Sequence, residues 1–557
     1  MKASITCLVV LVAAMSADAQ WEYGGRNIGY GDAYLSPKIA PDGNGGFFIV
    51  WDGFHAGRTT KDIILNHVDT AGVLLFGADG LSITDDTLNQ DEPRISADGE
   101  GGCYIVWHDT RDFSGGRASL YGQRVAADGQ LLWGSGVRMI YTVGNLHHGT
   151  GICADSALGI IGVCIMDTGT YHCWVFGQKL TPDGEIAWDS GGVVLFAAPD
   201  TTRYFNIFNP KITASDRWLY VTLIFSNAEV GDIYIQKFDL DGMVLWGPWG
   251  RPVSTDRRED GSWDEAASLQ ILPDGAGGTV VGWVATDPDL GTTLYADRIS
   301  PQGNSMWQVN GKRLYPNEIS NRFGLGLFCF DSFYSTYVAV GLGGAQGKYQ
   351  VVFSDGSLLA PDGMVLSEHS LKAAVAYLDT MYLMYADGWH YFASKKDIRA
   401  IEYWPTNPWI HGFLEYWDLL PDGVGGLYVA YSYYRDFLTN WVGIQRIYPD
   451  GHFGGDTTGV GDDETPILPG GSFELTNYPN PFNSETIVRF QANAKDDIKA
   501  EIFNLLGQKV AEFSVPVEKG GVNSLRLSLN QFPSGTYFLR VATDEGFSDV
   551  IAVTLLK

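Results

Sequence analysis

Positive charge is scarce in this 557-residue sequence, which has 37 Lys and Arg residues against 65 Asp and Glu residues. The formal net charge of −28 repels phosphate backbones, so no nucleic-acid partner is expected. Long apolar runs are also missing. Beyond the first twenty residues no stretch reaches about 18 apolar residues, the length that a spanning helix needs, so we expect no transmembrane segment.

The sequence also lacks the short motifs that mark common enzymes. It has no G-x-S-x-G elbow, H-E-x-x-H pair, Walker loop or dinucleotide fingerprint. Paired carboxylates for glycoside hydrolysis cannot be singled out among 65 acidic residues. We therefore predict no catalytic, cofactor-binding or metal-ligating residue and no cofactor, with weakly bound calcium among the acidic turns as the alternative.

Cysteine is rare, with six residues, of which Cys7 lies in the first twenty. Cys164 and Cys173 are placed symmetrically around Thr168-Gly169. A hairpin with that two-residue loop would oppose the two cysteines directly, close enough for a cross-strand disulfide. Two free thiols are the alternative. A zinc site among the His and Cys residues of 147–173 is disfavoured, because their spacing matches no compact structural site.

The N-terminal segment "MKASITCLVVLVAAMSADAQ" has the organisation of a secretory signal peptide. Lys2 supplies the positive start, residues 5–15 are apolar, and residues 17–19 have the small-x-small form of a cleavage site. We predict a signal peptide over 1–19 and a mature chain that starts near Gln20.

Glycine and aromatic residues are abundant, with 69 glycines and 13% Phe, Trp and Tyr, which favours an all-β protein. An Asp-Gly turn followed by a Gly-Gly pair and an apolar run recurs at Gly43, Gly99, Gly275 and Gly423. The Asp-Gly turn predicts a hairpin. The Gly-Gly pair indicates that the backbone passes close to a neighbouring repeat.

A second motif places a tryptophan four residues after a turn glycine. It occurs in "YGQRVAADGQLLW" and in three later copies that end at Trp188, Trp246 and Trp307. Each repeat has room for four strands, of which "FFIVW" would be the second and "VLLF" or "QLLW" the fourth. We expect the recurring tryptophan to pack between repeats.

Repeats of this period predict a β-propeller. Degenerate copies, including apolar runs near 331 and 379 and third strands at 349–359 and 398–404, bring the count to eight, with seven blades as the alternative. The repeats resemble a group of secreted bacterial proteins with recurrent "DGxGGxxxxW" and "QRxxxxGxxLW" segments. This resemblance covers about residues 37–455 and implies a propeller but no activity.

Composition changes after the repeats. Residues 456–472 are rich in Gly, Asp, Thr and Pro and are typical of a linker, so we assign the propeller to 20–455. Residues 473–557 contain six or seven short predicted strands, which suggests a small immunoglobulin-like sandwich.

This last segment closely resembles the type A sorting domain of the type IX secretion system. The matching segments are "YPNPF", "IFNLLGQKV" and "FPSGTYFLRV". The sorting motif comprises Tyr478, Pro479, Asn480, Pro481, Phe482, Gly507, Gly535 and Tyr537. The resemblance implies transport through the periplasm and outer membrane to the surface or the medium. It also implies partnership with the type IX machinery and its sortase-like processing enzyme, and attachment to surface lipopolysaccharide or release.

The region from 381 to 441 is the least repetitive and the most aromatic. Its aromatic residues either pack in degenerate blades or form a surface for a glycan or protein ligand. The candidate ligand-surface residues are Trp389, Trp404, Trp409 and Tyr433. The sequence thus predicts an exported binding or scaffold protein. The alternatives are a carbohydrate-active hydrolase or lyase on the same propeller and a purely structural coat component.

Overall fold

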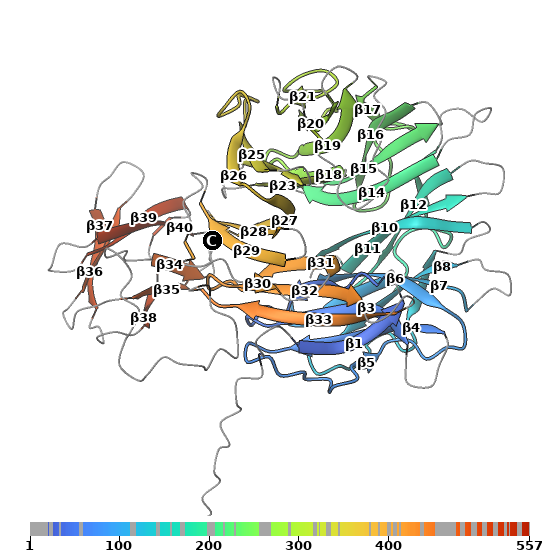
Figure 1. Ribbon diagram of the computed structural model, residues 1–557, viewed down its shortest axis with the longest axis horizontal. Coiled ribbons are helices and arrows are strands. Elements are labelled where there is room, and N and C mark those ends of the chain that lie inside the picture. Colours follow the sequence, from blue (N-terminus) through green and yellow to red (C-terminus); the bar gives the residue numbers. More distant parts are fainter. Residues whose placement is uncertain are drawn as a thin grey trace, which may run out of the picture. The chain divides into compact units, whose positions relative to one another are not determined.

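The chain divides into two compact units, Met1–Asp456 and Thr457–Lys557, which are described separately (Figure 1). The structure is a computed structural model. The residues it describes are 21, 26–32, 35–54, 60–111, 118–140, 145–155, 159–167, 173–197, 206–215, 218–227, 230–255, 269–287, 291–315, 320–321, 324–329, 336–342, 346–377, 380–387, 390–397, 403–404, 409–410, 414–434, 439–449, 451, 475–478, 485–491, 498–503, 509–515, 522–528, 532–533, 535–542 and 548–555.

The described part of the first unit is built of small antiparallel sheets of four main strands and contains no helix. Sheets 1 to 4 each use four consecutive strands. They are β2 (Lys38–Pro41), β3 (Phe47–Phe54), β4 (Lys61–Val68) and β5 (Leu81–Ser82); β6 (Gln90–Ala97), β7 (Cys103–Asp109), β8 (Ser119–Val125) and β9 (Val137–Ile140); β10 (Asn145–Asp155), β11 (Gly159–Asp167), β12 (Cys173–Leu180) and β13 (Val193–Phe196); and β14 (Asn206–Ser215), β15 (Trp218–Asn227), β16 (Val230–Asp239) and β17 (Arg251–Ser254).

Sheets 5 to 7 follow the same plan, and sheet 8 takes its fourth strand from the start of the unit. The strands are β18 (Leu269–Pro273), β19 (Thr279–Asp287), β20 (Gly291–Ile299) and β21 (Lys312–Arg313), with β22 (Ser320–Asn321) beside β20; β23 (Gly324–Cys329), β24 (Thr336–Leu342), β25 (Gly347–Phe353) and β26 (Met364–Ser367); β27 (Ser370–Tyr377), β28 (Thr380–Asp387), β29 (His390–Lys396) and β30 (Trp409–Ile410); and β31 (Leu414–Pro421), β32 (Leu427–Tyr434), β33 (Thr439–Ile447) and β1 (Arg26–Asp32).

The first strands of the eight sheets contact one another in cyclic order. β2, β6, β10, β14, β18, β23, β27 and β31 follow each other, and β31 also contacts β2. Each of these strands lies at the edge of its own sheet. Within the described part of the first unit, the sheets therefore follow one another around a ring, with their first strands innermost (Figure 1).

β1 joins the two ends of this ring, because it pairs antiparallel with β33 of sheet 8 (Figure 1). One hydrophobic cluster spans the junction and includes Phe47 and Trp51 of sheet 1 and Tyr428 and Val442 of sheet 8. Backbone pairing and apolar burial thus both link the first described strand to the last sheet.

The predicted second strands are confirmed in sheets 1, 2, 5 and 8, and so are the eroded copies β24 and β28. The predicted fourth strands are wrong. Leu74 and Leu131 of "VLLF" and "QLLW" make only isolated bridges, to Val68 and Val125. The fourth strand comes later in the chain, as β9 does, because the residues of the motif form a tight turn before it. The third strand predicted at 398–404 is also wrong, since β29 takes that place.

The Asp-Gly turns have one geometry in the four sheets where the motif is intact. In sheet 1, Oδ1 of Asp42 accepts hydrogen bonds from the amides of Asn44 and Gly46, at 2.7 and 2.9 Å. Gly43 and Gly45 have φ values of 78° and 93°, which favour glycine. A Cβ on Gly46 would lie 2.4 Å from the Val68 carbonyl oxygen of the same sheet. The expected close passage by a neighbouring sheet is therefore corrected for Gly46, which approaches its own sheet, whereas the Gly45 carbonyl accepts the Tyr428 hydroxyl of sheet 8 at 2.7 Å.

The recurring tryptophans pack between neighbouring sheets, as predicted. Trp133 of sheet 2 lies against Gly184 of sheet 3, where an added Cβ would be 2.7 Å from the indole ring. Its Nε1 donates to the Pro182 carbonyl at 3.1 Å. The same pair of contacts recurs for Trp188 with Gly242 and Leu240, Trp307 with Gly356 and Ser354, and Trp404 with Gly451 and Pro449.

The second unit contains two antiparallel sheets that share one hydrophobic core. One sheet has the order β34 (Leu475–Tyr478), β35 (Glu485–Gln491), β38 (Val522–Ser528), and the other has β37 (Lys509–Val515), β36 (Ile498–Phe503), β39 (Gly535–Ala542), β40 (Ser548–Leu555). Val488 and Leu527 of the first sheet pack in one cluster with Ile502, Leu539 and Val553 of the second.

Candidate functional site

At the acidic turns, where weak calcium binding was the alternative, basic side chains contact the aspartates. Asp98 uses Oδ1 for the amides of Glu100 and Gly102 and Oδ2 for the Arg124 guanidinium at 2.9 Å. Asp274 pairs with Arg298 and Asp422 with Arg446 in the same way, while Asp42 pairs with His67. These carboxylates therefore already have hydrogen-bond partners that would compete with a metal ion.

The basic side chain of each of these pairs also reaches the neighbouring sheet. Arg124 and Trp133 both donate to the Pro182 carbonyl, and Arg298 and Trp307 both donate to the Ser354 carbonyl. In sheet 1 a phenylalanine, Phe76, replaces the tryptophan and has no N–H. There the His67 ring nitrogen Nδ1 lies 3.1 Å from the equivalent carbonyl, of Ala127. These basic side chains are thus part of the packing between sheets.

The predicted aromatic ligand surface does not form a shelf in the described residues. Trp404 is 2% exposed and packs against Gly451, so its assignment to a ligand surface is wrong. Tyr433 is half-buried and its hydroxyl hydrogen-bonds Asn27 of β1, while burial raises the pKa of its phenol. Trp389 and the side chain of Trp409 lie outside the described residues.

The predicted disulfide between Cys164 and Cys173 is not formed. The strands β11 and β12 pair Cys164 with Phe176 and Asp167 with Cys173. Five residues therefore separate the strands instead of two, and the two cysteines are three pairs out of register. Cys164 is a free, buried thiol, and burial raises its pKa to about 12.

The sorting-motif residues lie in the second unit. Tyr478 ends β34, and Gly535 begins β39. Tyr537 is buried, donates its hydroxyl to the Pro533 carbonyl at 2.9 Å and packs against Phe532. Tyr537 therefore fixes the turn that precedes β39. Pro479, Asn480, Pro481, Phe482 and Gly507 lie outside the described residues.

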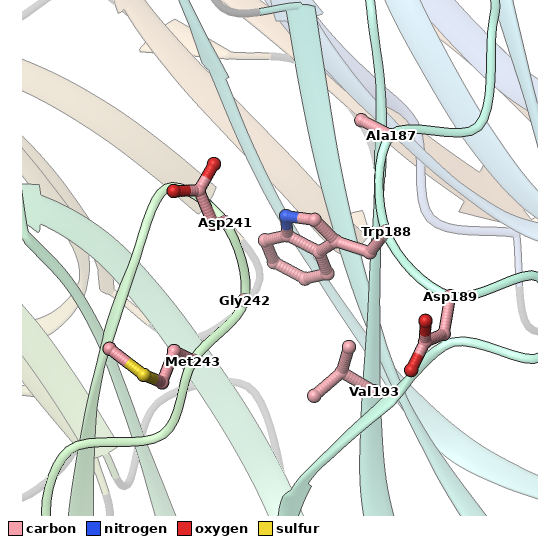
Figure 2. Close-up of a pocket in the computed structure, with 7 residues that line it drawn as sticks. All are labelled: Ala187, Trp188, Asp189, Val193, Asp241, Gly242 and Met243. Atoms are coloured by element: carbon pink, nitrogen blue, oxygen red, sulfur yellow. The ribbon is translucent and has the colours of Figure 1, made fainter.

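An open hollow of about 430 Å³ lies between sheets 3 and 4. Figure 2 shows Trp188 between the segment of Asp189 and Val193 and the turn of Asp241, Gly242 and Met243. The indole is 8% exposed and is held by its contacts with Gly242 and Leu240. Its described lining holds two carboxylates, those of Asp189 and Asp241, and no cation or hydroxyl.

Sequence reasoning missed a set of charges on the inner strands of the ring. Lys38 of β2, Arg94 of β6 and Asp418 of β31 each lie five residues before the glycine of an Asp-Gly turn. They pair with Val50, Val106 and Ala430 respectively, so they occupy one register position in sheets 1, 2 and 8. All three are partly exposed. Aligning the turn glycines would have revealed them.

A separate polar cluster lies near the start of β6. His108 is 5% exposed, and its Nδ1 is 3.9 Å from carboxylate oxygens of both Asp91 and Glu92. Lys61 pairs with Asp52 at 2.9 Å and with Asp91 at 3.8 Å. Glu92 has a φ of 52° at the irregularity between Asp91 and Arg94. In the described residues no group of three His, Cys, Asp or Glu side chains could hold a metal ion.

Comparison with known proteins identifies the second unit. Residues 476–552 match the family described as "Secretion system C-terminal sorting domain". This match supports the type IX resemblance and implies interaction with the type IX secretion machinery. No curated protein matches the sequence.

Solved structures resemble the chain only distantly. Prolyl oligopeptidase B from Galerina marginata is 12% identical with a TM-score of 0.40, over 85% of this chain and 57% of the oligopeptidase. The chain thus spans little more than half of that protein. Penicillium chrysogenum α-L-arabinanase is 12% identical with a TM-score of 0.33, over 55% of this chain and 93% of the arabinanase. These similarities are too low to carry an argument about function.

The described residues include no helix that is long and apolar enough to cross a membrane. The sorting domain indicates export to the cell surface or outer membrane. The chain therefore carries a secretion sorting domain over residues 476–552, preceded by a unit of small four-stranded antiparallel sheets.

Proposed function

We propose that the protein is an exported β-propeller of eight blades that serves as a binding or scaffold protein at the cell surface. The observation that carries the architecture is the cyclic contact of eight first strands, with β1 pairing to β33. Eight blades fit this order better than seven, because sheets 6 and 7 each have their own four strands.

The route to the surface rests on the two ends of the sequence. We infer that residues 1–19 are a signal peptide, that the mature chain starts near Gln20, and that an immunoglobulin-like sorting domain directs it to the type IX machinery. Processing by a sortase-like enzyme, followed by surface attachment or release, completes the proposed route.

Export can be tested in a bacterium with type IX secretion. The full chain and a chain truncated after residue 455 are each followed by cell fractionation. We expect the full chain at the surface or in the medium and the truncated chain in the periplasm. Equal export of both would contradict the role of the sorting domain.

The binding role is tested by incubating the full chain with a glycan array and by assaying bound glycans for hydrolysis products. Binding without turnover supports the proposal, because rings of sheets commonly carry ligands on variable loops. Turnover that is lost on substitution of a single carboxylate would replace the binding role with the hydrolase or lyase alternative. If the chain neither bound a glycan nor released a product, the result would favour a structural coat component.

A further inference from the structure

Within the described part of the ring, two cations on the inner strands lack the close aspartate partner that the arginines at the turns have. Lys38 and Arg94 occupy equivalent register positions on β2 and β6, which contact each other. Arg124, Arg298 and Arg446 each pair with a buried aspartate within 3 Å. Among the described residues neither Lys38 nor Arg94 makes an ion pair of this kind.

The hydrogen bonds of these two cations leave most of their donors unused. Lys38 Nζ donates to Ser36 Oγ at 3.0 Å, and Arg94 Nη1 donates to the Pro93 carbonyl at 3.0 Å. A guanidinium has five N–H donors in a planar fork, and an ammonium has three. Both acceptors are neutral, so the two positive charges are not balanced by them.

The nearby carboxylates make their hydrogen bonds and close ion pairs with groups other than Lys38 and Arg94. Asp418 Oδ2 accepts the edge amide of Ile39 at 3.0 Å, and its Oδ1 accepts the Leu419 amide at 3.2 Å. Asp91 and Glu92, which precede Arg94 in the chain, face His108 and Lys61 instead. With Asp418 as the counter-charge of both cations, the cluster of Lys38, Arg94 and Asp418 carries one excess positive charge.

The surroundings make this excess charge costly for the folded protein. Burial lowers the pKa of Lys38; the charge of Asp418 opposes that shift and the charge of Arg94 adds to it. Lys38 and Arg94 nevertheless remain partly exposed as residues. An anion between them would be stabilised more strongly than at an open surface, because water screens it less.

We propose that Lys38 and Arg94 bind an oxyanion group, either a carboxylate, a sulfate or a phosphate, on the inner strands of the ring. The planar fork of Arg94 matches the two oxygens of such a group, and Lys38 adds a point charge. A chain with a net charge of −28 repels anions in general, so binding an anion here depends on this local excess of positive charge. This inference rests on the proposed binding role of the ring and names its ligand chemistry.

The test measures thermal unfolding of the full chain against increasing sulfate, acetate or trigalacturonate at constant ionic strength. Ligand that binds only the native state stabilises it by RT ln(1 + [L]/Kd), so the unfolding midpoint rises with ligand concentration. The variants are Arg94→Gln and Lys38→Gln, and the matched control is Arg251→Gln, which removes an exposed cation of β17. We expect about tenfold more anion to be needed in either inner-strand variant, because it loses a charged hydrogen bond.

The three probes separate free anions from a uronate sugar. A larger response to trigalacturonate than to acetate identifies an anionic glycan, and similar responses identify a free oxyanion site. Identical responses of the wild type, Arg94→Gln and Arg251→Gln to all three probes would overturn the inference. If Arg94→Gln does not fold, Arg94→Lys, which keeps the charge but loses the fork, replaces it; an unchanged response of that variant overturns the inference. Glycan binding that is insensitive to these variants would refute this site while leaving the binding role intact.

Discussion

The indole of Trp21 lies against Gly72, and its Nε1 donates to the Thr70 carbonyl at 3.2 Å. Trp133 makes the same two contacts with Gly184 and Pro182 at the junction of sheets 2 and 3, two junctions further along the ring. Among the described residues, sheet 8 has no tryptophan at the position that Trp133 occupies in sheet 2. Trp21 fills that position at the junction of sheets 8 and 1. Arg446 of β33 donates to the same Thr70 carbonyl.

Replacement of Trp21 should therefore weaken ring closure. We expect Trp21→Ala to lower the free energy of unfolding of the first unit by about 3–5 kcal/mol, the usual cost of removing a buried large aromatic side chain. Urea unfolding followed by circular dichroism measures this. The control is Trp249→Ala, because Trp249 is 51% exposed. A loss of similar size in both variants would contradict the closing role of Trp21.

The turn glycines beneath the tryptophans should be intolerant of a side chain for two separable reasons. Gly184 has a φ of 83°, and a Cβ there would lie 2.7 Å from Trp133. Gly247 has a φ of 76° but open space around its Cβ position. We expect Gly247→Ala to cost about 1 kcal/mol through backbone strain alone and Gly184→Ala about 1–3 kcal/mol more through overpacking. Equal losses in chemical denaturation would show that the tryptophan moves aside freely.

The buried pair of Asp422 and Arg446 should be sensitive to loss of one partner. Arg446 is 8% exposed, and its Nη2 lies 2.8 Å from Asp422 Oδ2. We expect Arg446→Met to cost about 3–5 kcal/mol, because the aspartate is left buried and unpaired. Lys509→Met, which removes an exposed ion pair of the second unit, should leave the unfolding midpoint unchanged. An Arg446→Met midpoint equal to that of the wild type would contradict this account.

Asp297 should make stability depend on pH. In sheet 1 the amide nitrogen of Asn66 donates to the Gly77 carbonyl at 2.8 Å, and Gln123, Gln178, Gln236 and Gln350 do the same in their sheets. Asp297 stands at this position in sheet 5. It accepts the Trp307 amide, but its Oδ2 has no hydrogen-bond partner. Burial raises the pKa of Asp297 above 3.8, and hydrogen bonds from Ser305 and nearby amides offset this only partly.

A raised folded-state pKa means that the protonated acid favours folding. This contribution is fully present below the unfolded pKa and is lost as the pH rises through the folded pKa. We therefore expect Asp297→Asn to be about 1 kcal/mol more stable than the wild type at pH 7, with the difference shrinking toward acid pH. Thermal unfolding from about pH 3.5, just below the ordinary pKa of an aspartate, to about pH 8 measures how the difference between the two proteins changes with pH. Asp355→Asn is the control, because hydrogen bonds from Ser357 lower the pKa of that exposed acid. If the unfolding midpoints of the wild type and Asp297→Asn changed with pH in parallel, the role of Asp297 would be refuted.

The spacing of turn glycines and apolar runs predicted the repeating part of the fold well, because these features are local. The Asp42 turn, the strand of Phe47 and the packing of Trp133 all follow from residues less than one repeat apart. Features that depend on loop length were predicted poorly. The pairing of Cys164 with Cys173 depends on a two-residue loop, whereas five residues separate the two strands. The fourth strands begin one turn later than the apolar runs of the motif indicate.

The spacing pattern predicted a closed ring but could not show which elements close it. Trp21 and β1 lie outside the repeats, and their partners in sheet 8 follow about 400 residues later in the chain. The charges of Lys38, Arg94 and Asp418 were overlooked for a related reason. Each is unremarkable in its own strand, and only the contact between neighbouring first strands brings them together.

The pairing of β1 with β33 is the central claim, and hydrogen exchange tests it most directly. Mass spectrometry of the full chain compares the amides of residues 26–32 with those of 439–447. We predict that both segments exchange slowly and with similar opening free energies, because each holds the other in one sheet. Fast exchange of 26–32 beside a protected 439–447 would show that the first strand does not close the ring.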